Sequence, residues 1–230
     1  MNRRLLPLAV LPVSVLVSQI VTAQTPPPPG DFLERLKRTE AWEREIEEKQ
    51  PPDKVLDAAG VKPGMVVGEI GAGRGRYTLH LARRVGASGK VYANDIDADA
   101  LAFLHQRCQQ DGIANVEIVQ GEIEDARLPK GSLDAIFMVW VYHMVEKPVP
   151  LLRSFAASLK PGARVVMVEP IPQDIEGEVK AAAAHGHGNV HVNLLTPASV
   201  EAYAREAGFR LVSTMDKLLE RDIIYVLAKE

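Results

Sequence analysis

The 230-residue sequence predicts an α/β fold. We expect a doubly wound, mostly parallel seven-stranded sheet with an antiparallel C-terminal hairpin, in a three-layer αβα arrangement. From Met65 onward, apolar segments alternate with amphipathic ones, which is typical of βαβ units. The middle apolar segments are nearly continuous, as in parallel strands that helices cover on both faces. Only about three residues separate the last two apolar segments, which favours an antiparallel hairpin.

The expected strands cover 65–71, 90–96, 116–122, 133–141, 163–170, 209–218 and 222–229. Helix boundaries carry local signals as well. Thr196 and Pro197 begin a helix that Gly208 ends. Asp97 and Asp53 are expected to be N-caps of two further helices, because their side chains can accept hydrogen bonds from the first turn.

Residues 1–23 have the three-part pattern of a secretory signal peptide. Arg3 and Arg4 are followed by an apolar stretch over 5–21 and by small residues up to Ala23. We expect cleavage there, and export of the mature chain to the periplasm or beyond the cell, with no stable membrane insertion afterwards. The alternative is an uncleaved signal that anchors the protein, since the apolar stretch could cross a thin bilayer.

Residues 24–52 are expected to form a separate N-terminal segment. The stretch 25–30 contains four consecutive prolines, which favour an extended polyproline II tether. Apolar residues then recur at near-helical spacing over 31–50, which predicts an amphipathic helix that packs on the domain. The remaining residues, 53–230, are long enough for one domain with a full core.

The composition excludes several classes of function. The chain is 47% hydrophobic and 25% charged with a formal net charge of −3, and it has no basic stripe of the kind that binds DNA or RNA. Its single cysteine, Cys108, excludes an intrachain disulfide and a thiolate metal cluster. Cys108 lies on the apolar face of a predicted helix, so we expect it in the core.

The strongest functional signal is the sequence EIGAGRG at 69–75, which follows an apolar strand and opens a helix. Glycines permit a sharp turn and close contact between a ligand and the main chain, and a helix N-terminus adds free N–H donors. A tight turn without a ligand is the alternative. A dinucleotide fingerprint needs a third glycine at position 76, which is Arg, and no Lys-Ser or Lys-Thr follows as in a phosphate-binding loop.

Residues 53–170 resemble the class I S-adenosylmethionine-dependent methyltransferase family. The resemblance rests on 69–75 as the first motif, on 91–97 as the second strand, on Gly121-Glu122-Ile123 and on the turn LKPGA at 159–163. It implies S-adenosyl-L-methionine as the cofactor. The cofactor-binding residues that it implies are Glu69, Gly71, Ala72, Gly73, Gly75, Asp95, Ile96, Glu122 and Ile123.

Two acidic residues, Asp95 and Glu122, lie at the ends of the second and third predicted strands. Asp95 lies at the end of the second strand, about 24 residues after Gly71, where a carboxylate can accept hydrogen bonds from both ribose hydroxyls. By the resemblance, Glu122 contacts the adenine amino group and the next backbone N–H contacts the ring. Glu124 and Asp125 are rivals for that contact, and all three could be solvated loop acids.

Catalytic candidates follow the fourth predicted strand. In the family this loop faces the transferred methyl group, so His143 is the candidate general base and Tyr142 an orienting or wall residue. A loop histidine without a catalytic task is the alternative. The candidates for the substrate pocket lie further along the chain. They are Glu169 at the end of the fifth strand and the histidines of a glycine-rich loop, His185, His187 and His191.

Three closely spaced histidines could also bind zinc, but no cysteine or ordered acid pattern supports a metal, and we expect none. No large inserted domain accompanies the motifs, which favours a small-molecule methyl acceptor. Two other functions remain open. One is an exported nucleotide-binding module that kept the cofactor pocket without catalysis, and the other is a nicotinamide-dependent oxidoreductase, which the glycine spacing disfavours.

Overall fold

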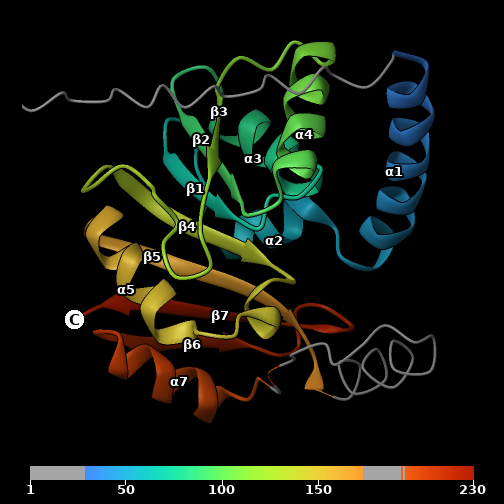
Figure 1. Ribbon diagram of the computed structural model, residues 1–230. Coiled ribbons are helices and arrows are strands. Elements are labelled where there is room, and N and C mark those ends of the chain that lie inside the picture. Colours follow the sequence, from blue (N-terminus) through green and yellow to red (C-terminus); the bar gives the residue numbers. More distant parts are fainter. Residues whose placement is uncertain (1–28, 173–192, 194) are drawn as a thin grey trace, which may run out of the picture.

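A seven-stranded sheet forms the centre of the computed structural model, which describes residues 29–172, 193 and 195–230 (Figure 1). The strands are β1 Val66–Ile70, β2 Lys90–Asp95, β3 Val116–Gln120, β4 Leu133–Val139, β5 Leu159–Pro170, β6 Phe209–Met215 and β7 Asp222–Lys229. Their order is β3-β2-β1-β4-β5-β7-β6. Strands β1 to β5 pair in parallel, and β7 runs antiparallel to both β5 and β6. The predicted fold class is confirmed.

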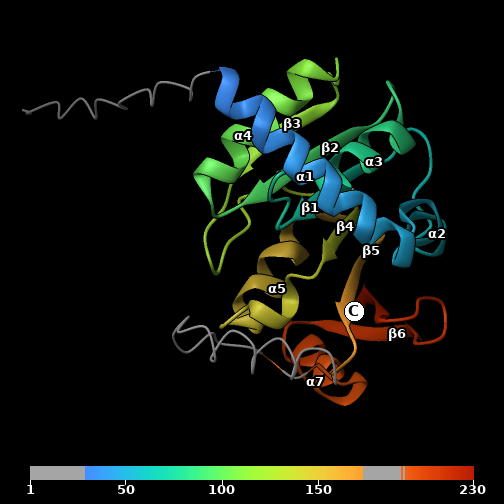
Figure 2. The ribbon, with the colours of Figure 1, turned by 90° about the vertical axis from the view of Figure 1, so that its right-hand side faces the viewer.

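Helices cover both faces of the sheet (Figures 1 and 2). They are α1 Pro29–Lys49, α2 Pro52–Ala58, α3 Arg76–Val85, α4 Ala98–Gln110, α5 Pro148–Ser158 and α7 Pro197–Glu206, with a short 3-10 helix η1 at Tyr142–Met144. Alternate residues of β4 face opposite layers. Phe137 packs with α2 and α3, whereas Ile136 and Met138 pack with α5 and α7. Alternating side chains of one strand therefore support two hydrophobic cores.

The predicted helix signals are confirmed in two of three places. The Asp97 side chain accepts hydrogen bonds from the N–H groups of Asp99 and Ala100, and Thr196 forms a capping box with Ser199. The predicted cap at Asp53 is wrong. The N-cap of α2 is Pro51, two residues earlier. Asp53 lies in the first turn of the helix and accepts a hydrogen bond from Arg84 at 2.8 Å.

The C-terminal hairpin is present, but its connection is longer than predicted, because β6 ends at Met215 and β7 begins at Asp222. Leu218 and Leu219 belong to the connection, and Leu219 is buried against the core. Their apolar character therefore reflects packing, and a pattern of apolar residues alone does not separate a buried loop residue from a strand residue.

The predicted N-terminal helix is present as α1, and buried and partly buried side-chain hydrogen bonds hold it against the domain. Arg107 of α4 donates two hydrogen bonds to Glu43, at 2.7 and 2.6 Å, and His80 of α3 contacts Glu47 at 2.8 Å. Not every apolar position of α1 packs inward, however: Trp42 is 48% exposed.

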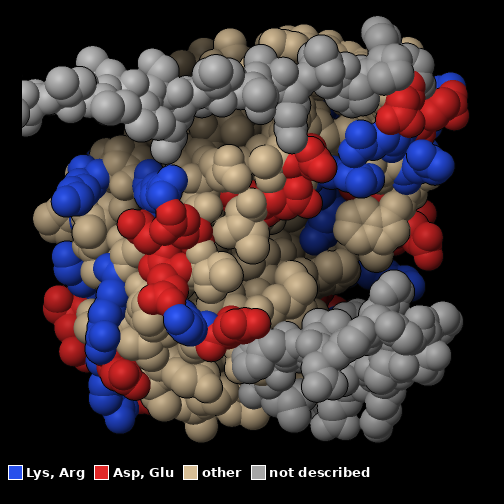
Figure 3. Space-filling view, in the orientation of Figure 1, with Lys and Arg blue, Asp and Glu red and all other residues tan. Residues whose placement is uncertain are grey.

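The predicted signal peptide and residues 25–28 of the predicted tether lie outside the described residues. The tether prediction is wrong for Pro29 and Gly30, which form the start of α1. Within the described ranges, no helix combines the length and apolar character needed to cross a bilayer. On the face shown in Figure 3, basic and acidic side chains of the described part of the chain are interspersed.

Candidate functional site

The glycine-rich loop between β1 and α3 takes a conformation that other residues resist. Gly71, Gly73 and Gly75 all have positive φ, at +71°, +53° and +95°. A Cβ on Gly71 would lie 2.2 Å from Cγ2 of Val141, which follows β4. A Cβ on Gly75 would lie 2.4 Å from a methyl carbon of Leu104 in α4. Glycine thus lets the loop press against two neighbouring segments.

Asp95 fixes this loop from the end of β2. One of its carboxylate oxygens, Oδ2, accepts a hydrogen bond from the Gly73 N–H at 2.8 Å, and Oδ1 accepts one from the Asp97 N–H at 2.9 Å. The side chain is only partly buried, so its oxygens keep capacity for further donors. Asp95 therefore joins the loop to the second strand and still faces the cavity described next.

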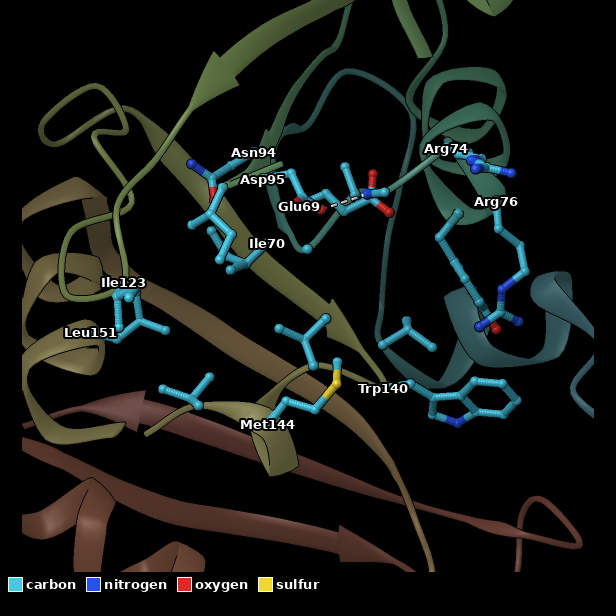
Figure 4. A pocket seen from close by; sticks show the side chains of 18 of the residues that line it. Glu69, Ile70, Arg74, Arg76, Asn94, Asp95, Ile123, Trp140, Met144 and Leu151 are labelled. Carbon is cyan, nitrogen blue, oxygen red and sulfur yellow. Dashed lines mark hydrogen bonds between the residues drawn. The ribbon is translucent and has the colours of Figure 1, made fainter. Parts of the chain in front are cut away.

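A cavity of about 610 Å³ lies along the carboxyl ends of the parallel strands (Figure 4). This is where open α/β sheets bind their ligands, and the volume suits a small molecule. Eight of the nine predicted cofactor residues line it: Glu69, Gly71, Ala72, Gly73, Asp95, Ile96, Glu122 and Ile123. The ninth, Gly75, is not among the lining residues, and its role is the sharp turn into α3.

Glu69 is a buried acid in the wall of the cavity. Its side chain accepts a hydrogen bond from the Thr78 hydroxyl at 2.6 Å. Burial raises the pKa of this carboxyl from 4.5 to about 8, although the Thr78 hydrogen bond opposes the shift. Glu69 is therefore mostly protonated at neutral pH, and a cation bound beside it would favour the ionised form.

The structure separates Glu122 from its two rivals. Glu122 lines the cavity, where it also pairs with Arg127, whereas Glu124 pairs with Lys147 and does not line it. Asp125 accepts a hydrogen bond from the N–H of Arg127, which closes a local turn. Among the three acids, only Glu122 has a position from which it could contact a ligand in the cavity.

The cavity continues to a second end that the sequence analysis missed. Arg76, at the start of α3, lies there with the rings of Trp42 and Trp140 (Figure 4 labels Arg76 and Trp140). Met144, 50% exposed, lies along the wall between the two ends. Trp140 has a φ of +58°, which is rare for a bulky residue and marks a strained position. The position of Arg76 directly after the glycine loop was the available signal.

A buried network supports this second end. The Gln50 side-chain oxygen accepts hydrogen bonds from Arg76 at 2.7 Å and from the Tyr77 hydroxyl at 2.9 Å. The Gln50 amide nitrogen donates to Asp222 at 2.8 Å, and the Trp140 ring nitrogen donates to the same carboxylate at 2.5 Å. The network joins the end of α1 to α3, β4 and β7.

The predicted catalytic pair is not on the cavity wall. Tyr142 is fully buried, so its predicted place as a wall residue is wrong. His143 is 7% exposed, and its Nδ1 lies 2.6 Å from Glu169. This geometry does not support His143 as the base. The left-handed turn at Trp140 carries the chain down against β5, which buries both side chains.

Glu169 is likewise not a pocket residue, because its side chain is fully buried. Its carboxylate accepts hydrogen bonds from the backbone N–H groups of Val141, Tyr142 and His143, at 2.8 to 3.3 Å. It therefore fixes the backbone of the loop after β4. The other pocket candidates, His185, His187 and His191, lie outside the described residues. Among residues that are described, no three His, Cys, Asp or Glu side chains are grouped to hold a metal ion.

Comparisons with known proteins agree with this geometry. Residues 67–162 match the family model described as "Methyltransferase domain". The ubiquinone/menaquinone biosynthesis C-methyltransferase UbiE of Idiomarina loihiensis is 35% identical over 115 residues, which cover 50% of this chain and 46% of that protein. The same enzyme of Salmonella arizonae is 31% identical over 150 residues, which cover 64% and 60%. The chain thus spans about half the length of the curated relatives it matches.

Solved structures show the same fold at low sequence identity. An S-adenosylmethionine-dependent methyltransferase from Aquifex aeolicus superimposes with a TM-score of 0.64 at 24% identity, over 76% of this chain and 88% of that one. Geranyl diphosphate C-methyltransferase from Streptomyces coelicolor gives 0.63 at 14% identity, over 79% and 76%. Fold, cavity and the family model over residues 67–162 together support a methyltransferase domain of the class I, S-adenosylmethionine-dependent type. By sequence, the domain is similar to the ubiquinone/menaquinone biosynthesis C-methyltransferases named above.

Proposed function

We propose that this protein transfers a methyl group from S-adenosyl-L-methionine to a small-molecule acceptor. The observation that carries the proposal is a set of large apolar side chains left exposed around the glycine loop. Five such residues are exposed in the described part of the chain, and four of them line the same cavity: Trp42, Ile96, Ile123 and Met144. Exposed apolar groups that converge on a cavity mark a ligand site.

The residues at the Asp95 end fit the cofactor. Asp95 can accept from the ribose hydroxyls, and Ile96 and Ile123, 58% and 54% exposed, offer apolar surface to an adenine ring. Glu122 lies where it can accept from an exocyclic amino group. Two buried carboxyls belong to the wall. Glu43 pairs with Arg107, whereas Glu69 is hydrogen-bonded to the Thr78 hydroxyl and so suits a positively charged ligand.

S-adenosylmethionine supplies a methyl group already activated on a sulfonium, so the protein has little covalent chemistry to perform. The chain's part is to hold the two reactants in line and to exclude water. The loop after β4 is well suited to this, because Glu169 fixes its backbone through three hydrogen bonds. Met144 and Val141 then present apolar surface to the cavity.

No histidine, lysine or cysteine is found in the cavity wall among the residues that the structure describes. We therefore assign the chain a role in alignment and desolvation rather than in proton transfer through His143. A small-molecule acceptor fits the cavity volume of about 610 Å³. The relatives that are named for ubiquinone/menaquinone biosynthesis lend support to a small-molecule acceptor.

The test is calorimetric titration of the purified protein with S-adenosylmethionine, S-adenosylhomocysteine and NAD. We expect S-adenosylmethionine and S-adenosylhomocysteine to bind with micromolar affinity and NAD not to bind. Binding of NAD alone would replace the proposal with a nicotinamide-dependent function. If none of the three ligands binds, the proposed function fails.

We further propose that the mature protein is exported, on the basis of the signal pattern at 1–23. Mass spectrometry of the protein from fractionated cells tests this. A mature species that begins at Gln24 and is found outside the cytoplasm is expected. An intact N-terminus in the membrane fraction would mean that the segment is an anchor.

A further inference from the structure

Arg76 forms a cationic, aromatic corner at the cavity end remote from Ile123 (Figure 4). Its guanidinium carbon lies 4.8 Å from the centroids of the Tyr77 and Trp140 rings and 5.7 Å from that of Trp42. The two tryptophans are the only ones in the chain. Aromatic faces stabilise a guanidinium but leave its N–H groups without strong acceptors.

The acidic groups near Arg76 have other hydrogen-bond partners. Glu69, which lies close enough to feel the Arg76 charge, accepts from the Thr78 hydroxyl. Glu43 forms the buried pair with Arg107, and Glu47 contacts His80. Asp222 accepts from Gln50 and from the Trp140 ring nitrogen. Among the described residues, the one hydrogen-bond acceptor of Arg76 is the neutral Gln50 amide oxygen, and no carboxylate forms an ion pair with the guanidinium.

The two arginines that α1 covers, Arg107 and Arg76, have different hydrogen-bond partners. Arg107 donates two hydrogen bonds to the carboxylate of Glu43, which lies in α1. Arg76 instead meets a neutral amide, that of Gln50, the residue directly after α1. Burial lowers the pKa of Arg76, but a guanidinium remains positively charged in proteins. A charge withdrawn from water without a counter-ion is costly, and Arg76 faces a cavity that can admit one.

We propose that Arg76 binds an acidic group, a carboxylate or a phosphate, on a flat apolar methyl acceptor whose body lies beside Trp42 and Trp140. The inference rests on the proposed function, because it assigns the Asp95 end of the cavity to the cofactor and this end to the acceptor. A guanidinium donates N–H groups in a planar fork that matches both kinds of oxyanion. The neighbouring rings provide apolar contact area for the acceptor's body.

The placement of the tryptophans gives a direct test that does not depend on activity. Because Trp42 and Trp140 both lie beside Arg76, the intrinsic tryptophan fluorescence of the protein reports on this corner alone. The protein, saturated with S-adenosylhomocysteine, is titrated with benzoate, with phenyl phosphate and with neutral benzamide. We expect saturable fluorescence changes with one or both anions and a weaker response to benzamide.

Three variants make the test specific. Arg76→Gln should weaken binding of the anions by about tenfold or more, and Arg76→Lys should retain part of the affinity. Arg83→Gln is the matched control, since it removes the same charge from an exposed position of α3. That control should bind the anions as the parent protein does. The stronger of the two anions identifies the acidic group as a carboxylate or a phosphate.

The outcomes separate the inference from the proposed function. If S-adenosylhomocysteine binds but neither anion is preferred to benzamide, the inference is wrong and the proposed function stands. The same holds if Arg76→Gln binds the anions as tightly as the parent protein. Absence of S-adenosylhomocysteine binding would overturn the proposed function itself. A selective, Arg76-dependent response to an anion supports the inference.

Discussion

The two ends of the cavity are built in different ways. The Asp95 end consists of main chain and side chains at consecutive strand ends, and each part lies in one short stretch of sequence. The Arg76 end is assembled from side chains far apart in the chain, such as Gln50 and Asp222, which are 172 positions apart. The first end carries the sequence motifs that lie within the stretch matched by the methyltransferase family model, whereas the second is where we propose that the acceptor binds.

A substitution in the glycine loop should have the largest effect on cofactor binding, and it tests the first end of the cavity. Gly71→Ala places a Cβ where the Val141 side chain already is and demands a left-handed φ of +71°. We expect binding of S-adenosylmethionine to fall below detection by calorimetry. Gly131→Ala is the control, because its φ is also positive, at +60°, but no atom lies within 4 Å. It should cost about 1 kcal/mol in unfolding free energy and leave binding intact. Normal binding by Gly71→Ala would contradict the loop geometry.

The two arginines under α1 should differ sharply in stability measurements. Arg107→Gln leaves Glu43 as a buried charge without its partner, so we expect a loss of about 3 kcal/mol in urea denaturation. Arg76→Gln leaves no carboxylate behind, and its loss should be about 1 kcal/mol or less. Equal losses would mean that Arg76 is mainly a structural residue.

Asp95 tests the cofactor end by itself. Asp95→Ala removes the acceptor for the Gly73 N–H and for the ribose hydroxyls, so we expect S-adenosylhomocysteine to bind at least about tenfold more weakly. Asp95→Asn keeps one acceptor oxygen and should show a smaller loss in the same titration. Unchanged affinity in Asp95→Ala would mean that Asp95 does not contact the ribose.

Glu69 should make cofactor binding depend on pH. Its carboxyl is protonated below about pH 8 in the free protein, so a cationic ligand must displace that proton in order to bind as an ion pair. The affinity for S-adenosylmethionine should therefore rise between pH 6 and pH 8, by up to about tenfold per pH unit, and level off above. Calorimetry across this range checks it. Glu69→Gln should flatten the profile, and a parent profile that is equally flat would refute the coupling.

The sequence predicted the fold and most of the residues that line the Asp95 end of the cavity, because both depend on local patterns. Strand and helix periodicities, the glycine spacing and Asp95 can each be recognised within a few residues. The second end could not be predicted in the same way, since Gln50, Arg76 and Asp222 meet only through tertiary packing. His143 and Glu169 were misplaced because a position after a strand does not say whether the side chain faces the cavity or the core.

The central claim is that one cavity holds the cofactor at its Asp95 end and leaves the Arg76 end for the acceptor. A crystal structure of the protein grown with S-adenosylhomocysteine tests this most directly. The account predicts the ribose hydroxyls within hydrogen-bonding distance of Asp95, with Arg76 and Trp140 uncovered by the ligand. A ligand lying across Arg76, with Asp95 free, would contradict it.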